Sequence, residues 1–373
     1  MRGSTDVDVG NVCVSNSSRC HHNADTLARK FGVAEGSASW VAADPGKVAE
    51  WYRSGGALDV ATESILIISV PPAATASHQE VPALAEHGAL CDYWTLTKPE
   101  VNFLIAVATL TGFYLGLPVQ LDHFPWLRLV HTLLGTLLVA SGTGTLNQYI
   151  ERHFDAHMRR TARRPLAAGR LTPNAVLWFG FALSSLGSIY LAIAVNTLAS
   201  LLAIATLVSY LFLYTPLKRK TPLCTLVGAF PGAMPPLIGW AAASGRLNLE
   251  AWILYVMLFL WQFPHFMSIA WMYREDYDRA GYFVLPHGPS KRHFVSLQTV
   301  LPLLALFLVS QLTASAGRPS ILYRVGALIL SLGFFYYGAQ FVFHRSSAAA
   351  RRLLMASIFY LPCVFILQVL DKH

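Results

Sequence analysis

Acidic residues are scarce in the apolar part of this chain, and most of them fall in two short clusters. Only eight carboxylates lie between Val101 and His373, and the clusters hold five of these: Glu151, Asp155, Glu275, Asp276 and Asp278. Each cluster follows a long apolar run. A carboxylate near a bilayer is costly, so it is usually kept only where it binds an ion, pairs with a cation or handles a substrate. The clusters therefore predict two halves of one site.

The first cluster predicts a polar stripe on one helix face. Asn147, Glu151 and Asp155 are spaced four residues apart, so on a helix each is rotated by only about 40° from the previous one. Hard oxygen donors suit Mg²⁺, which keeps several waters and binds one or two carboxylates together with substrate phosphates. The simpler interpretation is an interfacial helix end whose charges are solvated.

Four arginines follow this stripe within six residues, at positions 159, 160, 163 and 164. Arginine presents a planar fork of donors that binds phosphate oxygens in pairs. Anchoring of the loop at the membrane surface is the plainer role for any one of them. Together with the neighbouring carboxylates they form a consistent diphosphate site, with metal on one side of the anion and arginine on the other.

The second cluster lies in the segment Arg274-Glu275-Asp276-Tyr277-Asp278-Arg279. Helical spacing puts Glu275 beside Asp278 or Arg279 and turns Asp276 elsewhere, so at least one of these acids is predicted to be solvated or salt-bridged. Pro264 should kink the preceding helix and open space for a ligand. His265 beside it is either a contact to an acceptor substrate or a hydrogen-bonded packing residue.

The elements that must position these residues are membrane helices. Hydrophobic residues make up 54% of the chain, charged residues only 13%, and the mean hydropathy is +0.45. Because a spanning helix needs about 20 apolar residues, the sequence predicts an all-α integral membrane protein with nine transmembrane helices. Their approximate ranges are 101–120, 126–150, 174–194, 197–215, 222–243, 250–272, 294–315, 321–343 and 352–370.

Basic residues predict the orientation of this bundle. The net charge is +8, and the Lys and Arg residues concentrate in loops that alternate crossings place on one side of the membrane. The positive-inside rule then puts the N-terminus and both acidic clusters on the cytoplasmic side. The charge thus reflects a membrane surface, and no nucleic-acid partner is expected.

Residues 1–90 are predicted to form a polar, disordered cytoplasmic extension, followed by a nine-helix domain at 91–373. Cys13 and Cys20 precede His21 and His22, which allows a metal site, but a disordered terminal tract is the simpler interpretation. The composition fits neither a signal peptide nor an acid-poor transit sequence.

Several motifs together resemble a known family. The stripe is followed by Met158-Arg-Arg-Thr-Ala-Arg-Arg-Pro-Leu166, and further matches are Leu96-Thr-Lys-Pro99, Tyr214-Thr-Pro-Leu-Lys-Arg219, Gly228-Ala-Phe-Pro-Gly-Ala-Met-Pro-Pro236, Trp261-Gln-Phe-Pro-His-Phe266 and the Arg-Glu-Asp-Tyr box. Over about residues 92–370 the chain resembles the intramembrane aromatic prenyltransferase superfamily, and within it the branch that farnesylates heme. Glu151 stands where many members have Asp, and the second box departs from a clean Asp-x-x-x-Asp.

The resemblance implies a nine-helix bundle around a central cavity in which Mg²⁺ holds the diphosphate of farnesyl diphosphate. It assigns catalytic roles to Asn147, Glu151, Asp155 and Asp276, and metal binding to these four with Glu275 or Asp278 completing the second motif. It assigns diphosphate binding to Lys98, Arg160, Arg164, Tyr214, Lys218 and Arg274. The implied reaction joins the farnesyl group to the 2-vinyl group of heme B and adds water, giving heme O.

The resemblance also implies a location in a bacterial cell inner membrane or a mitochondrial inner membrane, and a downstream heme-modifying enzyme as a partner. Two alternatives remain. One is a prenyltransferase acting on a quinone precursor or chlorophyll-type acceptor, which the Arg-Glu-Asp-Tyr and Trp-Gln-Phe-Pro-His-Phe motifs disfavour. The other is an ion-coupled transporter, in which acids would lie near the bilayer midplane and not beside arginines at helix ends.

Overall fold

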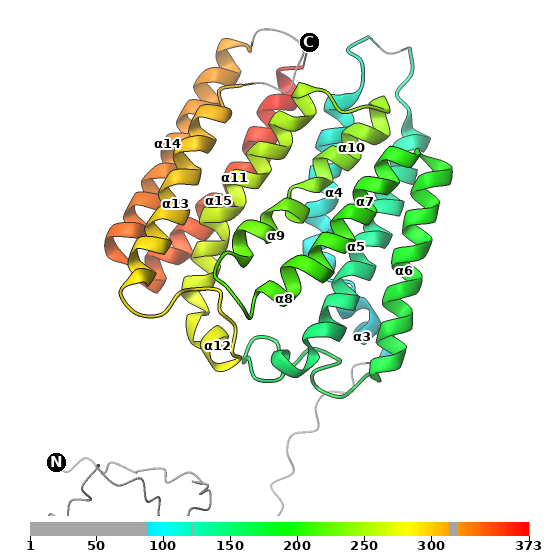
Figure 1. The fold of residues 1–373 in the computed structure, drawn as a ribbon. Coiled ribbons are helices and arrows are strands. Elements are labelled where there is room, and N and C mark those ends of the chain that lie inside the picture. The colour runs from blue at the N-terminus through cyan, green and yellow to red at the C-terminus, as the bar shows by residue number, and fades with distance from the viewer. Residues whose placement is uncertain (1–87, 121, 313–318, 373) are drawn as a thin grey trace, which may run out of the picture. The chain divides into compact units, whose positions relative to one another are not determined.

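The computed structural model describes residues 88–120, 122–312 and 319–372, and in these ranges the chain is helical with no strand (Figure 1). The helices are α3 (Ala89–Leu96), α4 (Pro99–Gly116), α5 (Trp126–Asp155), α6 (Pro173–Ala194), α7 (Thr197–Val208), η1 (Ser209–Tyr214), α8 (Thr215–Leu217), α9 (Cys224–Gly232), α10 (Met234–Ser244), α11 (Leu249–Met272), α12 (Arg274–Arg279), α13 (Ser290–Val309), α14 (Ile321–His344) and α15 (Ser347–Leu370). The predicted all-α membrane fold is confirmed. The predicted extension at 1–90 and its cysteine–histidine tract lie almost entirely outside the described residues.

Each of the nine predicted membrane segments coincides with helix, but the number nine is not confirmed. Within the described ranges, eight helical spans are long and apolar enough to cross a membrane. The segment that falls outside this set is α4, whose first turn contains Glu100 and Asn102. Two predicted segments are composite: η1 and α8 continue α7, while α9 and α10 meet at Ala233.

Local sequence signals explain where several helices begin and end. Thr172, Asn196, Ser320 and Ser346 are N-caps whose side chains accept a backbone N–H of the first turn, which satisfies a donor that the helix leaves free. Gly245 ends α10 in the left-handed conformation, with φ 71°. Pro264 lies inside α11, and the helix continues through it to Met272; the predicted kink stays a prediction.

The helices that carry polar side chains are also the most buried. The apolar window of the Cys224–Ser244 span is 72% buried, that of α11 is 61% buried and that of α5 is 50% buried, against 22% for Thr197–Leu217. Helix α5 packs against α4 and α6, α10 packs against α4, and α11 packs against α13 and α15 (Figure 1). The site therefore lies on inner helices, with α6, α13 and α14 towards the outside.

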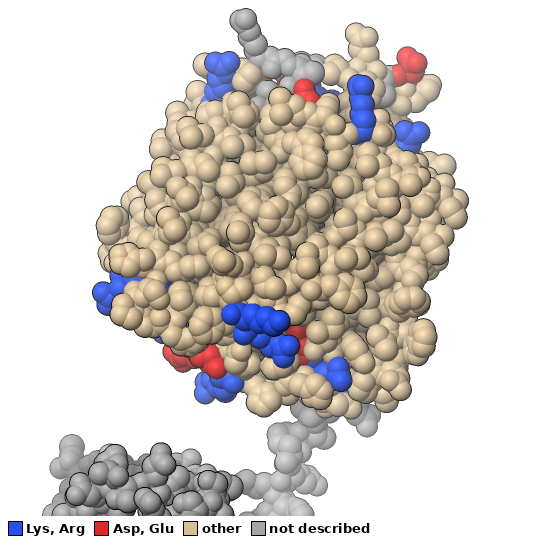
Figure 2. All heavy atoms as spheres, viewed as in Figure 1, with Lys and Arg blue, Asp and Glu red and all other residues tan. Residues whose placement is uncertain are grey.

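The surface matches a membrane setting. Large apolar side chains are widely exposed, among them Ile193, Ile321 and Phe343, each about four-fifths accessible. Figure 2 shows Lys, Arg, Asp and Glu at the two ends of the bundle and an uncharged band between them. Since lipid replaces water around such a band, these side chains are buried in the bilayer and need no protein cover.

Candidate active site

The predicted stripe on α5 is present, buried and paired with basic residues. Asn147, Glu151 and Asp155 are 1%, 6% and 3% exposed, because α5 remains helical to Asp155 and keeps all three on one face. Lys98 Nζ donates to Asn147 Oδ1 over 3.1 Å, Lys218 Nζ to Glu151 Oε1 over 2.8 Å, and Arg164 Nη1 to Asp155 Oδ2 over 2.6 Å. Each oxygen ligand thus has a basic partner from a different segment.

Lys98 reaches the stripe from the turn between α3 and α4, where it adopts the left-handed conformation with φ 54°. This turn is fastened to α5, since the carbonyl of Leu96 accepts hydrogen bonds from Gln148 Nε2 (3.0 Å) and Thr145 Oγ1 (3.4 Å). Left-handed backbone is uncommon for a residue with a side chain. These two hydrogen bonds hold the backbone two residues before Lys98 against α5.

Lys218 and Tyr214 are positioned by a π-helical turn. Residues Ser209–Tyr214 form η1 immediately before Pro216, whose ring cannot supply the usual helical N–H. Single π-turns of this kind often occur at functional sites. Lys218 Nζ lies 4.6 Å from the centroid of the Tyr214 ring, and a Cβ on Gly228 would come within 2.6 Å of that ring, so α9 approaches it closely only through glycine.

The arginine-rich loop connects the two acidic clusters. The Asp155 carbonyl accepts from the Thr161 hydroxyl, 2.8 Å away, and this holds the loop so that Arg164 turns back onto the Asp155 side chain. The Arg160 guanidinium lies 5.2 Å from the ring centroid of Tyr273, directly before α12. The loop thus reaches both the end of α5 and the start of the second cluster.

The three acids of the second cluster differ in exposure. The side chain of Asp276 is 12% exposed and lies 3.2 Å from Arg279 Nη1. The side chain of Glu275 is 80% exposed beside Arg274, and that of Asp278 is 45% exposed, 3.7 Å from His287 Nε2. Asp276 is therefore the most buried acid of this cluster, and the prediction that not all three acids face one ion stays a prediction. In the described parts of the chain, no three Asp, Glu, His or Cys side chains are placed to hold a metal.

His265 lies apart from the stripe, between α11 and α15. Its Nδ1 is 2.8 Å from the Ser357 hydroxyl, and its ring stacks on Trp261 at a centroid distance of 4.5 Å. The Trp261 indole N–H donates to the Ser357 carbonyl. These contacts belong to helix packing and leave Nε2 as the ring nitrogen available for an acceptor.

Lys98 and Lys218 differ in their pKa values because their charged neighbours differ. Burial, and after it the nearby Arg164 guanidinium, lowers the pKa of Lys98 to about 7. Burial opposes the charge on Lys218 as well, but the Glu151 carboxylate holds the pKa of this lysine well above its usual range. Lys218 is therefore a fixed cation, whereas Lys98 changes charge near neutral pH.

Tyr282 was not among the predicted site residues, but the loop after α12 places it at the site. Tyr282 is 4% exposed, and its ring packs on Phe154 at a centroid distance of 5.8 Å. Burial, followed by the Glu151 carboxylate, raises the pKa of this tyrosine, so its hydroxyl is a hydrogen-bond donor at neutral pH. Nothing in its sequence context indicates this role; only the fold brings residue 282 back to α5.

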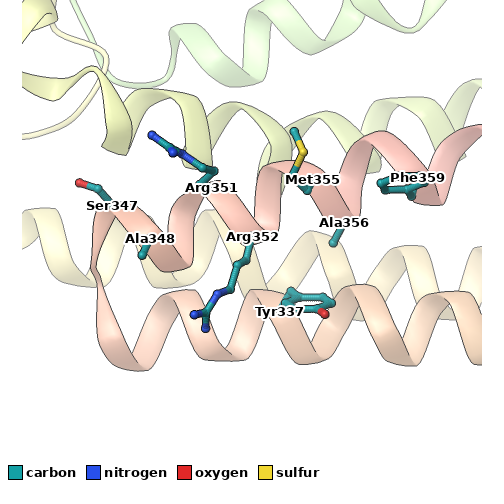
Figure 3. A pocket seen from close by; sticks show the side chains of 8 residues that line it. All are labelled: Tyr337, Ser347, Ala348, Arg351, Arg352, Met355, Ala356 and Phe359. Carbon is teal, nitrogen blue, oxygen red and sulfur yellow. The ribbon is translucent and has the colours of Figure 1, made fainter.

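A groove of about 830 Å³ lies elsewhere, between α14 and α15 (Figure 3). Its lining includes Tyr337, Arg351, Arg352, Met355 and Phe359. It contains none of the predicted site residues.

The fold and the buried acid–base site define a multi-pass membrane protein of the prenyltransferase class. Residues 105–361 match the model of the UbiA prenyltransferase family. The chain belongs to this family and is a prenyltransferase, as the motifs predicted. The transporter interpretation is not favoured.

Relatives extend over the same region. The chain is 48% identical over 287 residues to the protoheme IX farnesyltransferase of Solibacter usitatus (strain Ellin6076), covering 75% of this chain and 98% of the relative. It is 41% identical over 295 residues to that of Koribacter versatilis (strain Ellin345), covering 76% and 94%. The fold resembles a digeranylgeranylglyceryl phosphate synthase structure, with a TM-score of 0.61, 18% identity and coverage of 76% and 98%. It also resembles a UbiA homologue from Aeropyrum pernix K1, with a TM-score of 0.55, 22% identity and coverage of 72% and 98%.

Proposed function

We propose that this prenyltransferase transfers a farnesyl group from farnesyl diphosphate to the 2-vinyl group of heme B, with addition of water, to make heme O. The support is twofold. Relatives that match it along nearly their whole length are named protoheme IX farnesyltransferase. The buried site has the charges that a prenyl diphosphate requires.

One observation carries the proposal: each oxygen donor on the buried face of α5 is hydrogen-bonded to a basic side chain from another segment. Asn147, Glu151 and Asp155 are held by Lys98, Lys218 and Arg164 respectively. A diphosphate with its metal presents the matching charges, since its oxygens bind the basic groups and its metal binds the carboxylates. Binding can therefore exchange each internal pair for a pair with the ligand.

We propose Mg²⁺ as the metal, because the stripe offers oxygen donors only and no thiolate or imidazole. The donors are Asn147, Glu151 and Asp155, with Asp276 as the buried acid of the second motif. Glu275 and Asp278 are the candidates to complete it after movement of their exposed side chains. When bound, Mg²⁺ supplies positive charge that stabilises the leaving diphosphate.

The basic side chains complete the departure of the leaving group. The allylic carbon–oxygen bond breaks and its electron pair leaves with the diphosphate, which Lys98, Arg164, Lys218, Arg160, Arg274 and the Tyr214 hydroxyl stabilise. The vinyl group then attacks the allylic carbon, and water captures the resulting cation and releases a proton. Apolar walls of the bundle exclude other water from the farnesyl cation.

Within the membrane, the proposed orientation places the N-terminus and the site on the cytoplasmic side of a bacterial inner membrane, or on the corresponding side of a mitochondrial inner membrane. His265 is the proposed acceptor contact through Nε2. A downstream heme-modifying enzyme would receive the product.

The test is reconstitution. Purified protein in liposomes is incubated with heme B, farnesyl diphosphate and Mg²⁺, and the pigment is analysed by mass spectrometry. The expected product has the mass of heme B plus a farnesyl group and a hydroxyl group, and its formation stops when EDTA removes Mg²⁺. Absence of this product, under conditions in which a known synthase forms it, would refute the proposal. A quinone precursor added in place of heme tests the alternative acceptor.

A further inference from the structure

The loop after α12 is fastened across the site. Gly281 takes the left-handed conformation with φ 70°, which glycine adopts without strain. The Tyr282 N–H donates to the Tyr277 carbonyl over 2.9 Å, and the Phe283 N–H donates to the Lys218 carbonyl over 2.7 Å. Residues 280–283 thus connect the second acidic motif to the segment containing Lys218, the lysine that pairs with Glu151 of the first motif.

Within this loop, the Tyr282 hydroxyl is buried and has no hydrogen-bond partner among the described residues. The ring is well held: it packs with Met158 and Ala280, lies tilted against Phe154 and makes an edge contact with Tyr277. Buried hydroxyls are nearly always paired, because an unpaired one has lost its hydrogen bonds to water without replacement. An unpaired hydroxyl at this place indicates a bond that forms in another state of the site.

The neighbouring charged groups identify that bond. The ring of Tyr282 packs on Phe154, which lies one turn after Glu151 on α5. The Glu151 carboxylate is thus close to the Tyr282 hydroxyl, and the Asp155 carboxylate and the Lys218 ammonium also lie nearby. Lys218 at present occupies Glu151 Oε1, and Arg164 occupies Asp155. If a diphosphate draws the Lys218 ammonium towards itself, the Glu151 carboxylate loses that hydrogen-bond donor. The Tyr282 hydroxyl can then donate to Glu151 in its place.

We propose that Tyr282 is a positioning residue: when a prenyl diphosphate binds, its hydroxyl donates to the Glu151 carboxylate in place of Lys218 and fastens the 280–283 loop over the site. This inference rests on the proposed function, because it requires a diphosphate that engages Lys218. The hydrogen bond from Tyr282 to Glu151 would couple the loop after the second acidic motif to diphosphate binding at the first acidic motif.

The experiment compares wild type with Tyr282→Phe, which keeps the ring packing and removes the hydroxyl. The full chain in nanodiscs is given Mg²⁺ and farnesyl diphosphate, and hydrogen exchange of residues 279–284 is followed together with kcat and KM. Wild type should gain protection on binding. Tyr282→Phe should lose that gain and show a KM for farnesyl diphosphate raised about tenfold, with kcat changed much less. Tyr190→Phe, which removes a hydroxyl bonded to His131, should behave as wild type.

A second variant tests the acceptor. Lys218→Met frees Glu151 without any ligand but keeps the backbone carbonyl that holds Phe283, so the loop should become protected in the ligand-free protein. The double variant Lys218→Met/Tyr282→Phe should lose this protection.

The outcomes separate the two proposals. If wild type binds farnesyl diphosphate and Tyr282→Phe shows the same protection and KM, the role of Tyr282 is refuted and the proposed function stands. If Lys218→Met gives no ligand-free protection, Glu151 is not the acceptor and the inference is overturned. If wild type binds no farnesyl diphosphate, both proposals fail.

Discussion

Lys218 Nζ lies 2.8 Å from Glu151 Oε1 and 4.6 Å from the centroid of the Tyr214 ring, so one ammonium group joins α5 to the segment after η1. The side chains of Lys218 and Glu151 are 14% and 7% exposed. Removing one member of a buried pair leaves the other uncompensated, which is far costlier than losing a surface pair.

Lys218→Gln should therefore reduce both stability and activity. We expect a loss of about 3–5 kcal/mol, measured as a lower thermal unfolding midpoint in detergent, and at least a hundredfold lower turnover. The exposed Lys220 serves as the control, and Lys220→Gln should leave both quantities unchanged. Equal behaviour of the two variants would contradict a role for the buried pair.

Asp155→Asn should abolish turnover while the protein stays inserted and folded, because the amide keeps the volume but loses the charge that binds metal. Asp278→Asn should have a much smaller effect, since that side chain is 45% exposed. The activity of the two variants is measured as the rate of heme farnesylation over a range of Mg²⁺ concentrations. Near-normal activity of Asp155→Asn would refute its metal role.

Affinity for farnesyl diphosphate should fall as pH rises through about 7. The pKa of Lys98 is lowered to about 7, so the free protein carries this charge below that pH and loses it above. An anionic ligand favours the charged form, and KM should therefore rise by up to about tenfold per pH unit above 7. Lys98→Arg keeps its charge throughout and should flatten the profile; an unchanged slope in this variant would assign the effect to another group.

Gly228→Ala should displace Tyr214, because the added Cβ would meet its ring at 2.6 Å. Overpacking of this kind costs about 1–3 kcal/mol, and KM should rise as the Lys218 contact shifts. Gly333→Ala on α14 meets nothing within 4 Å and is the matched control. The two variants are compared by thermal unfolding and by KM, and identical results would show that Tyr214 adapts without cost.

Asp92 and Arg170 form a two-point ion pair that ties α3 to the loop before α6, with Asp92 4% exposed. Asp92→Ala should destabilise the protein by about 3–5 kcal/mol and should raise KM more than it lowers kcat, since α3 leads directly to Lys98. A thermal melt and steady-state kinetics check this. A variant with full stability would show that Arg170 finds another partner.

The helices and the first half of the site were predictable because both depend on short-range spacing. Apolar runs located the membrane segments, and the four-residue interval of Asn147, Glu151 and Asp155 was sufficient to place them on one face. The run of four arginines predicted a basic neighbour, which Arg164 supplies.

The pairing of side chains within the site depends on contacts between segments that are distant in the sequence, which spacing alone does not reveal. Periodicity does not say that Lys98 pairs with Asn147, or that Tyr282 returns to Phe154. The short helix α3 and the π-turn before Pro216 were also missed, because neither has a strong local pattern. The estimate of nine spans treated α4 like the others, although its polar first turn sets it apart.

The pairing of each ligand group on α5 with a base of the same protein also bears on product release. With no ligand present, Lys218 and Arg164 compensate the two carboxylates of α5, so neither acid is left as an unpaired buried charge. When diphosphate departs, Lys218 and Arg164 can return to Glu151 and Asp155, and the closing of these pairs offsets the separation of product from enzyme. The same contacts that hold the resting site together thus help it to turn over.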